Sequence, residues 1–86
     1  MSVTREDTID YYCSLKAVFV SGVLKNLAKG INPDIDRIEY EFEKSSEGSN
    51  IINEAVIIAF KSGSTRKVNV TADSYKQMTL DVLAKI

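Results

Sequence analysis

The sequence predicts an α+β fold, a two-layer sandwich in which a three-stranded antiparallel meander carries two helices packed on one face. Three observations lead to this prediction. Apolar residues recur with a helical period near both ends of the chain and with a period of two in the middle, which gives an α-β-β-β-α order. The connections between strands are short, which favours antiparallel pairing of consecutive strands. The chain has 86 residues, so we expect one core and a single domain over residues 1–86.

The first helix is predicted over about residues 5–29. Thr4 followed by Asp7 approximates a capping box at its start, and Gly30 supplies a stop. Its core-facing stripe, at the spacing of one helix face, is predicted to be Ile9, Tyr12, Cys13, Phe19, Val20, Val23, Leu24 and Leu27. Lys16 projects from the same apolar face, and we expect its stem to pack there while its charge reaches an edge or a carboxylate.

A second apolar stripe lies on the same predicted helix and points well away from the first. It consists of Tyr11, Leu15, Val18 and Gly22. Two interpretations stay open. Either the second helix covers this stripe within the chain, or the stripe is an interface with a second copy or another protein, because so much apolar surface is seldom left in water. These four residues are the candidate dimer interface.

Three strands are predicted over about residues 35–44, 51–61 and 65–71. Residues 45–50 form a polar loop between the first two strands. The first and third strands alternate between apolar and polar residues, whereas the second is apolar on both faces, which is typical of a central strand. The inward-facing residues are predicted to be Ile38, Tyr40, Phe42, Val56, Ile58, Phe60, Val68 and Val70.

The second helix is predicted over about residues 73–86, with Thr71 or Asp73 as its cap. Residues recur at helical spacing along it: Tyr75, Met78, Thr79, Val82, Leu83 and Ile86. Of these, Met78, Val82 and Leu83 are predicted to close the core.

The order of elements is similar to that of double-stranded-RNA-binding domains over nearly the whole chain. The resemblance implies phosphate contacts from basic residues at the start of the second helix, where residues 71–76 hold one lysine and one acid. It also implies a histidine in the loop between the first two strands, which is absent. The similarity is therefore one of topology, without the motifs that read RNA.

Composition excludes several kinds of chemistry. The sequence has no histidine and a single cysteine, Cys13, which excludes a His-dependent triad, a cysteine-based zinc site and an intrachain disulfide. We expect no enzyme activity, no cofactor and no metal site, and we expect Cys13 to be buried and inert. The first ten residues lack the pattern of a secretory signal, and no segment approaches a membrane span, which favours a cytoplasmic protein.

Charge is segregated along the chain although the formal net charge is −1. Residues 34–47 hold six acids and two bases, a net charge of −4. The outward face of the first strand holds Glu39, Glu41 and Glu43. With the outward Ile57 of the central strand they form a candidate surface for a basic partner. The other interpretation is a solvated sheet face, with Lys67 of the third strand near Glu39.

These observations favour a small non-enzymatic protein–protein interaction or regulatory module, similar in size and charge to regulators and inhibitors of phages and mobile elements. The predicted partner is a second copy, forming a homodimer, or another protein. We expect no membrane and no small-molecule substrate. The alternative is a nucleic-acid-binding domain that places the basic residues of hairpin 61–67 on phosphates. Those residues are Lys61, Arg66 and Lys67.

Overall fold

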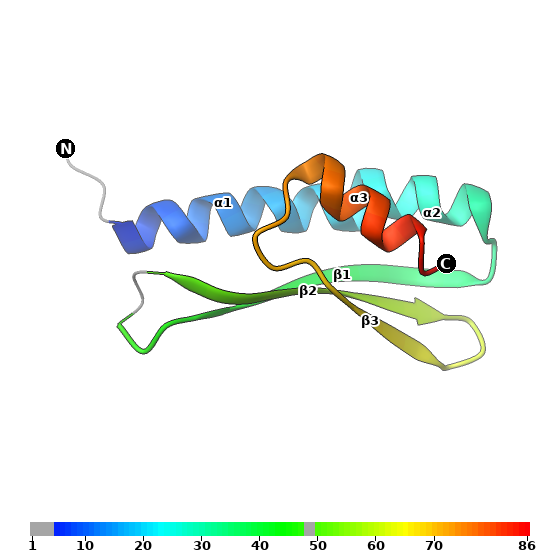
Figure 1. The fold of residues 1–86 in the computed structure, drawn as a ribbon. Coiled ribbons are helices and arrows are strands. Elements are labelled where there is room, and N and C mark those ends of the chain that lie inside the picture. The colour runs from blue at the N-terminus through cyan, green and yellow to red at the C-terminus, as the bar shows by residue number, and fades with distance from the viewer. Residues whose placement is uncertain (1–4, 48–49) are drawn as a thin grey trace.

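The protein folds as an α+β sandwich, as the sequence predicts. The structure, a computed structural model, describes the backbone of residues 5–47 and 50–86 and the side chains from Ile9 onward within those ranges. In this part of the chain, a three-stranded antiparallel sheet in the order β1-β2-β3 forms one layer. A long N-terminal helix and the C-terminal helix α3 form the other, on the same side of the sheet (Figure 1).

The long helix consists of three consecutive segments: α1 (Arg5–Phe19), the π-helical turn η1 (Val20–Leu24) and α2 (Lys25–Ile31). It runs without a break and ends two residues beyond the predicted end. Asn32 adopts an extended conformation there, and its N–H donates to the Ala28 carbonyl at 2.8 Å. Gly30 therefore lies inside the helix rather than at its stop.

The π turn corrects the predicted core stripe. In an α-helix, residues four apart drift around the axis by about 40° per step. The i→i+5 geometry of η1 slows this rotation, so that Val20, Leu24 and Ala28 stay in line over the sheet and are fully buried. Val23 and Leu27, which were expected in the core, are turned outward and are exposed.

Tyr12 is a second correction to the predicted stripe. Its position is one residue before the fully buried Cys13, which places it about 100° around the helix from the sheet. Its side chain is exposed, whereas Phe19 and Ile9 are partly buried.

The sheet is built from β1 (Ile35–Lys44), β2 (Ile51–Phe60) and β3 (Thr65–Asn69). Their registers place Tyr40 opposite Val56 and Val56 opposite Val68. Strand β3 pairs with the stretch of β2 from Ala55 to Ala59. The far end of the β1–β2 hairpin therefore extends beyond the third strand (Figure 1).

Helix α3 (Tyr75–Leu83) begins later than predicted, because Ser74 and neither Thr71 nor Asp73 is its cap. The Gln77 N–H donates to Ser74 Oγ at 3.1 Å, which satisfies one of the free donors of the first turn. Ala72 has a φ of 62°, a left-handed conformation that turns the chain out of the sheet.

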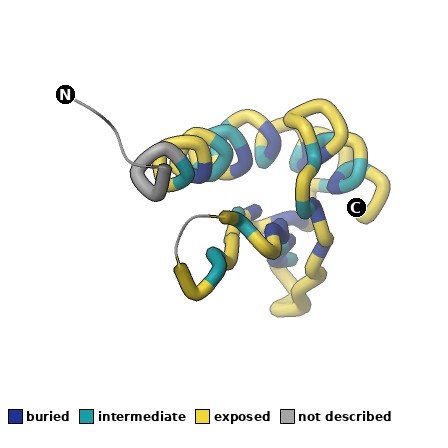
Figure 2. Tube along the Cα trace, turned by 60° about the vertical axis from the view of Figure 1, so that its left-hand side comes forward, coloured by how far each residue is buried: buried dark blue, intermediate teal, exposed yellow. Residues whose placement is uncertain are grey.

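The core lies between the helical layer and the inner face of the sheet (Figure 2). Its buried residues are Val20, Leu24, Ala28, Ile35, Ile38, Val56, Ile58, Val68, Val70, Met78 and Val82. Tyr40, Phe60 and Leu83 pack against this cluster and are partly buried. Phe42, expected in the core, is 38% exposed, because β3 does not extend to that end of the hairpin.

Candidate functional site

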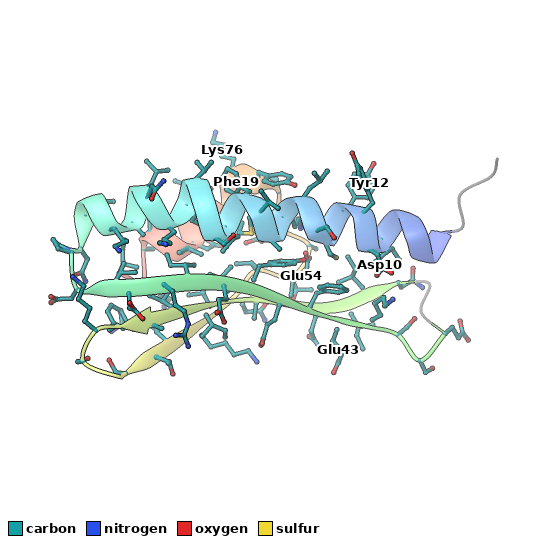
Figure 3. The ribbon with its side chains drawn as sticks, turned by 180° about the vertical axis from the view of Figure 1, so that it is seen from behind. Asp10, Tyr12, Phe19, Glu43, Glu54 and Lys76 are labelled. Carbon is teal, nitrogen blue, oxygen red and sulfur yellow. The ribbon has the colours of Figure 1, made fainter. Side chains whose placement is uncertain are left out.

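The outward side of the long helix exposes a row of large apolar residues. They are Tyr11, Tyr12, Leu15, Val18, Val23, Leu27 and Ile31, with exposed fractions of 43–71%. We call these seven residues the exposed helix face. Figure 3 shows Tyr12 pointing away from the sheet.

Helix α3 does not cover the second stripe predicted on this helix. Its first residue, Tyr75, packs edge-on against Phe19 with the ring centroids 5.1 Å apart. That contact half-buries Phe19 and leaves Tyr11, Leu15 and Val18 exposed. Of the two interpretations of the stripe, coverage by the second helix therefore does not hold within the described residues. Gly22 lies on the same side and is partly buried.

The exposed helix face carries no charged side chain. Between Tyr11 and Ile31 the charged residues of the long helix are Lys16, Lys25 and Lys29. Lys25 and Lys29 each lie about 200° around the helix from Leu27, but they follow Val18 and Gly22 by seven residues and so border the face. Lys16 points toward the sheet instead, where it meets a carboxylate.

That carboxylate belongs to Glu54, the buried charged residue of the described core. Glu54 is 4% exposed, and its Oε1 lies 2.7 Å from Lys16 Nζ. Lys16 Nζ also donates to the Asp73 carbonyl at 3.2 Å. The expectation that Lys16 carries its charge to a carboxylate is confirmed. Figure 3 shows Glu54 between the long helix and the sheet.

Glu54 joins four parts of the fold. Besides Lys16 of α1, it accepts from Tyr40 Oη of β1 at 2.5 Å and from the Ala72 N–H at 2.8 Å. Its own N–H donates to Thr71 Oγ1 at 3.0 Å. Burial raises the pKa of Glu54, but the hydrogen bonds from Lys16, Tyr40 and Ala72 outweigh it and hold the pKa below its ordinary value of 4.5.

The neighbouring groups stay protonated. Burial, followed by the hydrogen bond to Glu54, raises the pKa of Tyr40 well above its ordinary value of 10.0. Burial also raises the pKa of Cys13 from 9.0, and its Sγ lies 3.7 Å from Tyr40 Oη. A thiol and a phenol that keep their protons are poor nucleophiles. The cluster therefore has the chemistry of a structural tie between layers.

Sequence analysis did not single out Glu54, although a signal was present. Glu54 lies two and four residues before Val56 and Ile58 on the same strand, so it faces inward as they do. A glutamate at an inward position of a central strand requires a partner, and Lys16 was the unexplained cation.

The candidate partner surface lies on the outer face of the sheet, and its glutamates have partners from the same chain. Glu39 lies 3.2 Å from Arg37 Nε, and Glu41 lies 3.2 Å from Lys67 Nζ. Glu43 accepts from Asn53 Nδ2 at 3.1 Å; Figure 3 shows it on the side of the sheet away from the helix. Ile57 is partly buried between these strands. A shallow groove of about 780 Å³ opens here, lined in part by Glu41 and Glu43.

The basic hairpin residues of the alternative function are also engaged in part. Arg66 donates to the Lys85 carbonyl and lies over the Phe60 ring, 5.4 Å from its centroid. Lys67 pairs with Glu41, and Lys61 is exposed. The three cations are thus not presented together to one ligand.

Within residues 9–47 and 50–86, no group of three or more cysteine, aspartate or glutamate side chains is placed to hold a metal ion. No helix in the described part of the chain has the length and apolar character needed to cross a membrane. No protein-family model matches the chain, and neither a curated protein nor a solved structure matches it. The topological resemblance to double-stranded-RNA-binding domains accordingly stays a prediction.

Proposed function

We propose that this chain is a small, non-enzymatic protein–protein interaction module that binds through the exposed helix face and acts in the cytoplasm. The observation that carries the proposal is that seven large apolar residues of the long helix lie outside the core and stay 43–71% exposed. A contiguous apolar patch beyond a few hundred Å² is rare on a protein that works alone.

The remainder of the described chain supports binding over catalysis. The buried ionisable residues Lys16 and Glu54 satisfy each other, and Glu54 is further held by Tyr40. Groups that are paired in a core in this way hold elements together. The single thiol, Cys13, is buried, which makes it a poor nucleophile for a substrate.

The acidic face of the sheet is the second surface of the proposed module. Glu39 and Glu41 are already balanced by Arg37 and Lys67, and exposed pairs of this kind contribute little. A basic partner would have to displace these contacts. The exposed helix face needs no such displacement, so we assign the main binding role to it.

The experiment is site-specific photo-crosslinking in the cells that produce the protein. Val18 is replaced by p-benzoylphenylalanine, and Thr65, exposed on β3 at the sheet layer, is replaced in a matched control. We expect a discrete covalent product from position 18 and none from position 65. Adding Leu15→Glu to the first chain should abolish the product.

Two results would contradict the proposal. One is the absence of any product from position 18 above the level of position 65. The other is a product that is unchanged by Leu15→Glu, which would mean that the contact does not use the exposed helix face.

A further inference from the structure

The geometry points to a second copy of this chain as the occupant of the exposed helix face, with the two long helices antiparallel and crossing near Gly22. This inference rests on the proposed function and names its partner. It is carried by the area of the face, its lack of charge, the open surface at Gly22 and the distribution of charge along the helix.

The area matches what a stable dimer requires. The exposed fractions of the seven residues add up to roughly 800 Å² of residue surface, polar atoms included, and a standard interface buries about 800 Å² on each partner. The largest apolar patch of an ordinary monomer is about 300–600 Å². The exposed helix face extends along most of the molecule, whose longest dimension is 44 Å.

The lack of charge favours an identical partner. In a two-fold interface the same patch meets itself, so a charge near the axis would face its own copy, and a charge elsewhere on the patch would be buried unpaired unless the patch also carried the opposite sign. Lys16 is withdrawn into its pair with Glu54, and Lys25 and Lys29 are partly buried at the border of the face, seven residues after Val18 and Gly22. Two such faces can be buried against each other without an unpaired charge. A nucleic acid would need cations on this face.

Gly22 supplies a crossing point. It lies near the middle of the face, eleven residues after Tyr11 and nine before Ile31. A Cβ placed on Gly22 would meet no atom within 4 Å, so the helix surface is open there. The π turn η1 is centred on the same residue. A second helix that crosses here approaches closely, while Val18 and Val23 flank the contact.

The charges along the helix favour the antiparallel arrangement. The sequence of α1 has three acids, Glu6, Asp7 and Asp10, and one base, Arg5, near its start, and α2 has Lys25 and Lys29 near its end. Antiparallel helices bring the acidic start of each copy toward the basic end of the other and oppose the helix dipoles. Parallel helices would instead bring the two acidic starts together and the two basic ends together.

Sedimentation velocity of the purified chain over a hundredfold concentration range tests the association. We expect a monomer–dimer equilibrium in the wild type, weakened at least tenfold by Leu15→Glu and by Val18→Glu with unchanged circular dichroism. Thr65→Glu adds the same charge at an exposed position of β3 and should dimerise as the wild type does. A strict monomer, or a dimer that both helix variants retain, would overturn the inference.

Disulfide trapping tests the register. In a Cys13→Ala background, Gly22→Cys should form a covalent dimer with itself under mild oxidation, because equivalent residues meet only near the two-fold axis. Tyr12→Cys should not link to itself but should link to Ile31→Cys in a mixture. Self-linking at both Gly22→Cys and Tyr12→Cys would indicate parallel helices and contradict the antiparallel arrangement.

Other occupants give distinguishable results. If the monomer binds vesicles of anionic lipid and Leu15→Glu abolishes that binding while no dimer forms, the face is a membrane surface and both the inference and the proposed function fail. If crosslinking from Val18 yields a different protein and no self-product, the second copy is excluded while the proposed function stands.

Discussion

Lys16 lies on the sheet-facing side of the long helix, between residues that pack into the core. An ammonium group there loses most of its hydration, and Glu54 replaces that hydration at 2.7 Å. The carboxylate in turn accepts from Tyr40 and from the Ala72 N–H, so its oxygens are satisfied on three sides. A buried pair of this kind adds little to net stability, but removing one member is costly, because the other is left buried without its counter-charge.

Lys16→Met should therefore destabilise the fold by about 3 kcal/mol, the low end for breaking a buried ion pair, because Lys16 keeps some exposure. Urea unfolding followed by circular dichroism measures the change. Lys29→Met, which makes the same replacement on the same helix, should alter the free energy of unfolding by less than about 0.5 kcal/mol.

A double variant separates lost charge from lost packing. Lys16→Met combined with Glu54→Gln removes both charges, and we expect it to be more stable than Lys16→Met alone. Equal free energies of unfolding for Lys16→Met and Lys29→Met would show that the ion pair is not needed for stability.

From the sequence alone, Lys16 could be identified as a member of a buried ion pair, but its partner could not. Lys16 stood out because it interrupts an apolar stripe, and its need for a carboxylate followed from the cost of burying a charge. The identity of the carboxylate could not follow, because it depends on how the helix is placed along the sheet. Strand parity turns Glu54 inward, but it does not say which helix residue lies opposite.

At the scale of elements, the strands were predicted more accurately than the helix faces. The alternation in β1 and the apolar run in β2 determine their faces directly, and β1 has the predicted bounds. The faces of the long helix depend on a constant 100° per residue, and η1 breaks that assumption. This is why Val23 and Leu27 were expected inside and lie outside.

The two glycines Gly22 and Gly63 should respond oppositely to alanine. Gly22 is helical with open space at its Cβ, so Gly22→Ala should stabilise the monomer by about 0.5–1 kcal/mol. Gly63 has a φ of +94° in the β2–β3 turn, so Gly63→Ala should destabilise by about 1 kcal/mol or more. Thermal unfolding in a Leu15→Glu background measures both without a contribution from association. A loss of stability in Gly22→Ala would contradict the open surface at that residue.

At the scale of the whole molecule, the Glu54 cluster links the long helix, the sheet and the chain that leads to α3 (Figure 3). A change of protonation in this cluster therefore loosens both layers at once. The titration of Glu54 should be visible in global unfolding rather than in one segment only.

Stability should form a plateau bounded by acid and alkaline decline. The pKa of Glu54 is lowered in the fold, so its contribution is present above the unfolded value of 4.5 and is lost as the pH falls through the folded pKa. The pKa values of Cys13 and Tyr40 are raised in the fold. Their contributions are present below 9.0 and 10.0 and decline above those values.

Chemical denaturation from pH 2 to 11 measures both limits. Glu54→Gln should reduce the loss of unfolding free energy at acid pH, and Tyr40→Phe should reduce the loss at alkaline pH. Both variants should also have a lower free energy of unfolding at neutral pH, because a hydrogen bond in the core is weakened or lost. An acid limb with the same slope in Glu54→Gln would show that other carboxylates control acid unfolding.

Because of the π turn, the side chains that this part of the helix presents to solvent depend on how many residues the turn contains. A wide turn holds one residue more than a regular turn between the same two buried positions. Deleting a single residue from Val20–Leu24 would restore regular winding with the flanking buried residues in place, and would change which side chains of the turn face outward. A chain one residue shorter here would keep nearly the same composition and the same core chemistry. It would nevertheless expose different side chains of the turn. Binding by this helix can therefore change through the insertion or deletion of one residue, without any substitution.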